Sequence, residues 1–300
     1  MDYLKRISHV FKYSDEIIFD DDSKFIIMSD VHRGDGNWSD SFAKNQSIFF
    51  AALSYYFNEN YTYIELGDGD ELWEVRNLKD IIYEHSDSFW LMKKFYDNNR
   101  LYMIYGNHDM VKKYPQYVEK NLYEFFSERH NKYFDLFKNI KVHEGLILKN
   151  KDSKIEILLI HGHQVDVLNS NMWRIARFLV RYFWRPLENL CFKDVTRTAK
   201  NYKKKNDVAK KLTEWVIKEN KMLIAGHNHR PMFSEPGEMP YFNDGSCVHP
   251  RCITGIEIDK GNISLIKWSI ITNEKRILKV ERSLLAGPKK INDYFKNNIL

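Results

Sequence analysis

The stretch "LIAGHNHRP", Leu223 to Pro231, places a glycine and two histidines directly after an apolar run. A short apolar run of this kind predicts a buried strand. In an extended chain residues i and i+2 point to the same side, so His227 and His229 can direct their imidazoles into one small volume. We interpret them as a pair of metal ligands. Two surface histidines at a strand end are an equally good explanation of this stretch taken alone.

Four other apolar runs end in residues that can bind metals. The motifs that follow these runs are "DVH" (30–32), "GDGDELW" (67–73), "GNHD" (106–109) and "HGH" (161–163). Each has a simpler explanation by itself, such as a turn or a capping aspartate. In open α/β sheets, however, ligands collect beyond the carboxyl ends of the strands. Five such strand ends together predict one shared site.

The order of apolar runs and amphipathic segments predicts an α/β fold with two packed sheets. We expect strands at 24–30, 61–68 and 100–109 with helices at 41–60 and 78–98 between them, adjacent strands at 141–150 and 154–163, a strand at 221–229, and a β-meander over 241–285. No linker or repeat interrupts this pattern. We therefore expect one domain, 1–300, with a helical insertion at about 166–220.

Composition limits the class of protein. A hydrophobic content of 43% in 300 residues supports a large core, and the net charge of +5 is too small to indicate nucleic-acid binding by itself. The three cysteines show no CxxC spacing, which favours a reducing compartment. No stretch has the length of a membrane span or the apolar core of a signal peptide. We expect a cytoplasmic protein, with contact at the inner face of a membrane left open.

The five motifs, in this order, resemble those of the calcineurin-like metallophosphoesterase superfamily, over Asp30 to His229. The resemblance implies a four-layer αββα sandwich, here with a helical cap insertion. It also implies a dinuclear metal centre, with His108 as the catalytic histidine and Asp109 as its orienting partner. The implied ligands are Asp30, His32 and His229 for one metal, Asn107, His161 and His227 for the other, and Asp68 as the bridge.

Physical chemistry accounts for this choice of residues. Imidazole and oxygen ligands without thiolates suit Mn, Fe, Zn, Co or Ni better than Mg or Ca, and manganese is the ion we favour. Two divalent ions held about 3.5 to 4 Å apart can clamp the attacking and leaving oxygens of one phosphoryl group. His108 is then available to stabilise phosphoryl oxygens or to protonate the leaving group.

The stretch "NMWRIARFLVRYFWRPLENL" (171–190) bears on the substrate. On a helix ending at Pro186, the arginines 174, 177, 181 and 185 lie on one side and apolar residues cover much of the rest. One interpretation is a cap in which Arg174, Arg177 and Arg181, together with Arg33 of the first motif, bind an amphiphilic phosphate substrate. The same helix could dock on an anionic membrane. The alternatives are a packed apolar face with solvated arginines and, less favoured, a nucleic-acid groove.

Within the superfamily the chain is closest in appearance to the UDP-2,3-diacylglucosamine hydrolases, through Glu71, Trp73 and "GHNHRP". It departs from them in carrying His163 instead of aspartate and His108 instead of arginine. Three hypotheses follow. The first is a phosphodiesterase or pyrophosphatase acting on a nucleotide-linked or lipid-linked substrate. The second is a phosphomonoesterase, including a phosphoprotein phosphatase, and the least favoured is a non-catalytic metal-binding protein that docks on membranes.

Overall fold

The computed structural model describes residues 2–127, 130–166, 173–184 and 202–296, and these residues form two large β-sheets. Sheet A has the strand order β1 (Asp15–Phe19), β8 (Gly145–Asn150), β9 (Glu156–Ile160), β10 (Met222–Ala225) and β11 (Tyr241–Asn243). Sheet B has the order β14 (Leu278–Lys290), β13 (Asn262–Thr272), β12 (Cys252–Asp259), β2 (Phe25–Met28), β3 (Thr62–Leu66), β4 (Leu101–Ile104) and β7 (Val142–His143). Sheet B is parallel from β2 to β7 and antiparallel from β2 through β12 and β13 to β14.

Alternating side chains of the strands enter two different cores. In β2, Phe25 and Ile27 pack between the sheets, whereas Ile26 and Met28 pack on the opposite face of sheet B. Strand β10 behaves in the same way in sheet A, where Met222 points between the sheets and Leu223 points away from them. Because both faces of these strands are covered, their sequences are apolar at every position.

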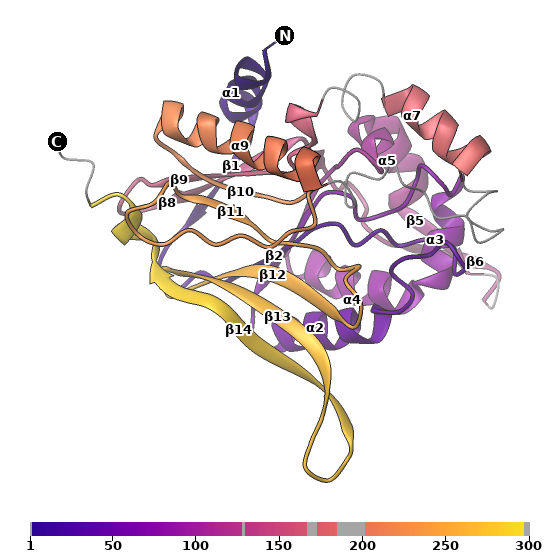
Figure 1. Ribbon diagram of the computed structural model, residues 1–300. Coiled ribbons are helices and arrows are strands. Elements are labelled where there is room, and N and C mark those ends of the chain that lie inside the picture. Colours follow the sequence, from indigo (N-terminus) through magenta and orange to yellow (C-terminus); the bar gives the residue numbers. More distant parts are fainter. Residues whose placement is uncertain (1, 128–129, 167–172, 185–201, 297–300) are drawn as a thin grey trace.

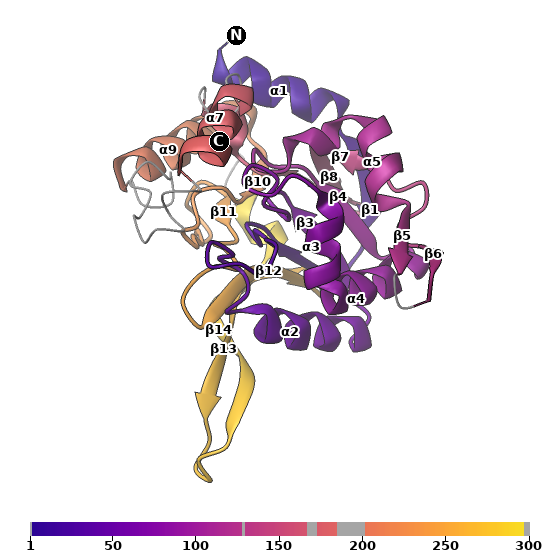
Figure 2. The same ribbon diagram turned by 90° about the vertical axis from the view of Figure 1, so that its right-hand side faces the viewer.

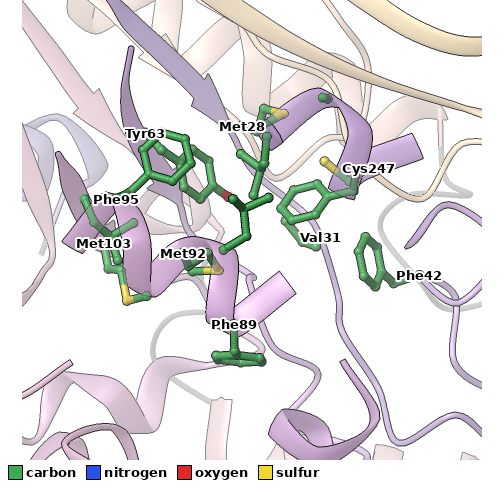
Figure 3. Packing of buried hydrophobic residues seen from close by; sticks show 14 of the residues in the cluster. Met28, Val31, Phe42, Tyr63, Phe89, Met92, Phe95, Met103 and Cys247 are labelled. Atoms are coloured by element: carbon green, nitrogen blue, oxygen red, sulfur yellow. The ribbon is translucent and has the colours of Figure 1, made fainter. Parts of the chain in front are cut away.

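Helices cover the outer face of each sheet, which completes four layers (Figure 1). On sheet B lie α2 (Gln46–Asn58), α3 (Leu78–Glu84), α4 (Ser86–Asp97) and α5 (Pro115–Leu122). Figure 3 shows Met92 and Phe95 of α4 beside Met28 and Tyr63 of sheet B. On sheet A lie α1 (Tyr3–Tyr13) and α9 (Tyr202–Glu219). The predicted αββα sandwich is therefore confirmed.

Two predictions about the elements were wrong. The helix expected at 78–98 is broken at His85, whose buried imidazole lies 2.9 Å from the carboxylate of Asp40. Residues 241–243 belong to no meander, because β11 pairs in parallel with β10 in sheet A, where Tyr241 and Phe242 are buried on opposite faces. The meander is confined to β12, β13 and β14. The β5 (Glu124–Ser127) and β6 (Lys132–Asp135) hairpin was not predicted.

Helices lie at 173–184 and 202–219, within the range 166–220 where an insertion was predicted. Helix α7 (Trp173–Leu179) continues into a π-helical turn, η3 (Val180–Trp184), while Arg185 and Pro186 lie outside the described residues. The end of the predicted insertion, α9, is part of the sandwich itself because it packs on sheet A. Among the helices of the described segments, none is long and apolar enough to cross a bilayer.

Candidate metal centre

The first group of predicted ligands comes from the ends of β2 and β10. The Nε2 atom of His229 lies 2.9 Å from Oδ1 of Asp30 and 3.3 Å from Nε2 of His32. Asp30 is fully buried and His32 is 7% exposed. One oxygen and two imidazole nitrogens therefore surround a single point, as the ligands of one metal ion would.

The second group comes from the ends of β3, β9 and β10. Asp68, His161 and His227 bring a carboxylate oxygen and two imidazole nitrogens close together in a buried position. Oδ2 of Asp68 lies 3.1 Å from Nε2 of His161 and 3.9 Å from Nε2 of His32, which belongs to the first group. Asp68 thus stands between the two groups, where a bridging carboxylate is needed.

The donor atoms fit a pair of divalent metal ions. Oδ1 of Asn107 and the Nε2 atoms of His161 and His227 are buried and form no hydrogen bond with the described residues. Polar atoms buried without partners are costly. Coordination by metal ions would satisfy all three. The set contains nitrogen and oxygen donors without sulfur, which agrees with the class of ions expected from the sequence.

Hydrogen bonds outside the cluster fix the orientation of two imidazoles. Nδ1 of His161 lies 2.9 Å from the carbonyl oxygen of Leu66, and Nδ1 of His32 lies 2.9 Å from Oε2 of Glu71. With Nδ1 directed at its oxygen, the Nε2 atom of each ring faces the cluster. This arrangement is common for histidines that bind metals.

Several of the predicted metal ligands have a strained backbone conformation. Five of them have positive φ angles, namely Asp30 (50°), His32 (51°), Asp68 (51°), His227 (70°) and His229 (53°). This conformation is uncommon for residues with a Cβ atom and concentrates at functional sites. Glycines next to the ligands allow close approach. A Cβ atom on Gly106 would lie 2.1 Å from Oδ1 of Asp68, which explains the glycine before Asn107.

The carboxylates and imidazoles of the site shift each other's pKa values. Burial alone would raise the pKa of Asp68, but the imidazoles of His161 and His108 outweigh it and hold that pKa well below its usual value. Burial lowers the pKa of His161, and the carboxylates of Asp68 and Asp30 overcome this effect and raise it to about 9. The carboxylates therefore stay ionised at neutral pH, which favours the binding of cations.

Comparison with known proteins identifies the family. The family model of the calcineurin-like phosphoesterases matches residues 23–231. The chain belongs to the calcineurin-like phosphoesterase family. Metal-dependent hydrolysis of phosphoesters is the activity that membership implies. A solved structure, Vps29 of Chaetomium thermophilum, is similar with 11% identity and a TM-score of 0.40, covering 88% of this chain and 95% of that chain. Among curated proteins no match is found.

In this phosphoesterase, Glu71 and Trp73 hold the predicted catalytic histidine. Nδ1 of His108 lies 2.7 Å from Oε1 of Glu71, and the indole of Trp73 stacks on the imidazole at 4.2 Å between ring centroids. The side chain of His108 is 17% exposed, so the ring reaches the surface of the site. Sequence reasoning noted Glu71 only through the family resemblance. Its position three residues after Asp68 was the available signal.

The prediction that Asp109 orients His108 was wrong. Oδ1 of Asp109 accepts a hydrogen bond from the amide of Gly106 at 2.7 Å, and Oδ2 accepts bonds from the amide of Gly69 and from Nζ of Lys112. Asp109 is fully buried. It therefore joins the loop after β3 to the loop after β4, and orienting His108 is left to Glu71.

The prediction that Arg33 contacts a substrate phosphate was also wrong. Its guanidinium is fully buried, with both Nη atoms bound to the carboxylate of Glu65 and Nε bound to Oδ1 of Asp70 at 2.7 Å. Lys112 binds the other oxygen of Asp70 at 2.6 Å. Arg33, Glu65, Asp70, Lys112 and Asp109 form a buried ion network. It connects the loops after β2, β3 and β4, which are three of the five loops that carry predicted metal ligands.

The arginines of α7 and η3 differ from one another. Arg181 was expected to bind phosphate, but its guanidinium donates hydrogen bonds to the carbonyl oxygens of Leu72, Trp73 and Val75, at 2.6, 3.0 and 3.1 Å. We therefore assign Arg181 to holding the Trp73 loop. Arg177 lies over the ring of Trp173 at 4.9 Å, and its role in substrate binding stays a prediction. The side chain of Arg174 lies outside the described residues.

Helix α7 is anchored beside His108, the predicted catalytic histidine. Trp173 packs in a small buried cluster with Trp73, Tyr105 and Met110. Trp73 is the residue that stacks on His108. The inserted helix therefore lies at the edge of the metal centre through Trp173 and Arg181. Further along the same element, Phe178, Leu179 and Tyr182 are 60, 48 and 52% exposed.

Proposed function

We propose that this phosphoesterase hydrolyses a phosphodiester or pyrophosphate bond with two divalent ions, manganese being favoured. The observation that carries the hydrolytic part of the proposal is the pairing of His108 with Glu71 directly beside the two groups of metal ligands, and the choice of a diester or pyrophosphate rests on the cavity described below. Asp30, His32 and His229 would hold one ion, Asn107, His161 and His227 the other, and Asp68 would bridge them. When bound, such ions activate water at neutral pH and withdraw negative charge from the phosphoryl group.

The protein itself supplies the acid. With Nδ1–H of His108 donated to Glu71, Nε2 is free to face the substrate. In the protonated ring, Nε2–H can donate its proton to the leaving oxygen, and the carboxylate of Glu71 stabilises the imidazolium. Stacking on Trp73 keeps the ring in one plane. His108 is therefore proposed as the general acid and Glu71 as the residue that positions it.

A cavity lined by residues that follow Trp73 supports a substrate larger than a simple monoester, although none of the predicted metal ligands lines it. It has a volume of about 340 Å³ and is lined by Asp35, Glu74, Val75, Arg76, Asn77, Asp80, Arg181 and Tyr182. Glu74 and Val75 directly follow Trp73, and Asp35 lies on the loop that carries His32. The cavity gives room for a second group attached to the phosphate, as in a diester or a pyrophosphate.

The surface at this cavity favours an amphiphilic substrate. Tyr182 lines the cavity and contacts the ring of Phe178 at 4.9 Å, and both side chains are exposed. An apolar tail could lie on this surface while a polar group occupies the cavity, where Arg76 donates a hydrogen bond to the hydroxyl of Tyr182. We therefore infer a nucleotide-linked or lipid-linked phosphoester, as in the UDP-2,3-diacylglucosamine hydrolases.

A phosphomonoesterase, including a phosphoprotein phosphatase, is the second candidate. The Glu71 and His108 pair would protonate the alkoxide of a monoester equally well. The two candidates are separated by measuring hydrolysis of an aryl phosphodiester beside the matching monoester, with manganese supplied and with His108→Ala as control. Preference for the diester, lost in the control, supports the proposal. Preference for the monoester would assign the enzyme to the phosphatases.

A further inference from the structure

The hairpin of β13 and β14 extends beyond the edge of sheet B. Pairing between β12 and β13 ends at Cys252 and Ser269, whereas β13 and β14 stay paired from Ile270 with Val280 to Thr272 with Leu278. Residues 270–280 therefore form a ribbon with no third strand among the described residues. Figures 1 and 2 both show this ribbon projecting from the body of the molecule.

The end of the ribbon exposes large aliphatic side chains. Ile277 and Leu278 are 57 and 69% exposed, and Ile270, on the same face as Leu278, is 41% exposed. The turn is well defined, because the amide of Ile277 donates to Oδ1 of Asn273 at 2.9 Å and the amide of Asn273 donates to the carbonyl of Ile277 at 3.0 Å. The aliphatic pair is therefore presented in a fixed position.

Basic residues surround this aliphatic pair. Lys275, Arg276 and Lys279 are exposed, and Glu274 is the acidic residue between Asn273 and Lys279. Lys279 pairs with Glu281, so the three positive and two negative charges of residues 273–281 leave a net charge of +1, carried by Lys275 and Arg276 next to Glu274. The whole chain is also positive, at +5. Aliphatic side chains next to lysine and arginine are the combination that binds anionic lipid surfaces.

We propose that the turn of the β13–β14 hairpin docks on an anionic lipid surface. Ile277 and Leu278 enter the interfacial layer, and Lys275 and Arg276 contact the acidic headgroups. This docking does not depend on the substrate of the metal centre. The contact with lipid would then lie on the β13–β14 hairpin, whereas α7 lies at the metal centre.

The shape and charge of the turn favour lipid over the other occupants. A second copy would bring two positive turns together, which repel each other. A stable protein interface buries about 1,200 Å² or more in total, and a convex turn with two prominent side chains offers little of this area. A fluid lipid interface needs no complementary surface. The geometry and charge therefore fit a bilayer best.

Sedimentation with lipid vesicles tests the proposal. The wild-type protein should bind vesicles of mixed phosphatidylglycerol and phosphatidylcholine, bind pure phosphatidylcholine poorly, and be released by raised salt. Replacing Lys275 and Arg276 by glutamine removes both positive charges. Each replacement should weaken vesicle binding by about fivefold, and the salt dependence of binding should decrease. The double variant Ile277→Ser/Leu278→Ser should weaken binding by at least a similar factor at unchanged charge.

The matched control is Ile217→Ser on α9, because Ile217 is also 57% exposed. This control should bind as the wild type does, and all variants should hydrolyse a soluble aryl substrate normally. The proposal is overturned if the wild type does not bind anionic vesicles, if the hairpin variants bind like the wild type, or if Ile217→Ser loses as much binding. Light scattering that shows a dimer dissociated by Ile277→Ser would assign the turn to a second copy.

Discussion

Oε1 of Glu71 lies 2.7 Å from Nδ1 of His108, and Oε2 of the same carboxylate lies 2.9 Å from Nδ1 of His32. One side chain thus positions both a predicted metal ligand and the predicted acid. Burial would raise the pKa of Glu71, but the imidazoles of His108 and His32 outweigh it and hold the pKa well below its usual value. The carboxylate therefore stays ionised over the pH range in which histidines titrate.

We expect Glu71→Gln to reduce kcat by about 10- to 100-fold, because an amide keeps the shape but no longer stabilises an imidazolium. Rates at neutral pH with an aryl phosphoester would measure this loss, with the exposed Glu119→Gln as control. An unchanged kcat would remove Glu71 from the positioning of His108.

Asp68→Asn should lower the affinity for both metal ions, because Asp68 stands between the two groups of ligands. Metal content after dialysis against a low concentration of manganese would show the effect without an activity assay. His108→Ala is the matched control and should retain both ions, since His108 is not a proposed ligand. Loss of a single ion in Asp68→Asn would contradict the bridging assignment.

Replacing Arg33 by Met should destabilise the protein by about 3–5 kcal/mol, because Glu65 and Asp70 would remain buried without their partner. The free energy of unfolding in urea would measure this loss. Arg33→Lys should recover part of it, since a single ammonium cannot bind both carboxylates as the guanidinium does. Full stability combined with weakened substrate binding would instead restore Arg33 as a substrate contact.

Arg181→Ala should lower the hydrolysis of small and large substrates to the same degree, because the Trp73 loop loses three hydrogen bonds. Stability should fall by about 1–3 kcal/mol for the carbonyl oxygens left unpaired. Arg177→Ala, one turn earlier, should leave a small aryl substrate unaffected. Comparison of kcat/KM for the two substrates decides the role, and a loss limited to the large substrate would assign Arg181 to binding.

His143 should make stability depend on pH. Burial, with a smaller effect of Lys141, lowers the pKa of its imidazole to about 4, while Asp15 opposes the shift. In the unfolded chain His143 therefore becomes protonated near pH 6.5, whereas in the folded chain it becomes protonated only near pH 4. The contribution of His143 to the free energy of unfolding is complete above pH 6.5. It falls by about 2–3 kcal/mol as the pH decreases towards 4.

Urea unfolding of His143→Gln and wild type at pH 7 and pH 4.5 would test this prediction. The loss of stability on acidification should be smaller in the variant, because glutamine does not titrate in this range. An equal loss in both proteins would show that other groups cause the acid sensitivity.

The sequence by itself determined the sandwich and the convergence of the ligands. Each apolar run ends in a short polar motif, and parallel strands bring their carboxyl ends to one edge, so local pattern was sufficient for Asp68 and His161. The alternation of helices and strands likewise predicted two packed sheets, whereas the four layers were implied by the family resemblance.

Only the tertiary structure decided which polar groups meet. Arg33 and Asp109 stand inside the motifs, yet both are buried. Glu65 and Asp70 approach Arg33 from β3 and the loop after it, and the amide of Gly69 approaches Asp109 from that same loop. Glu71, on the loop after β3, contacts His108, on the loop after β4. Strand β11 pairs with β10 in sheet A and does not belong to the meander. Such partners are set by the packing of distant segments, which local spacing in a single chain does not specify.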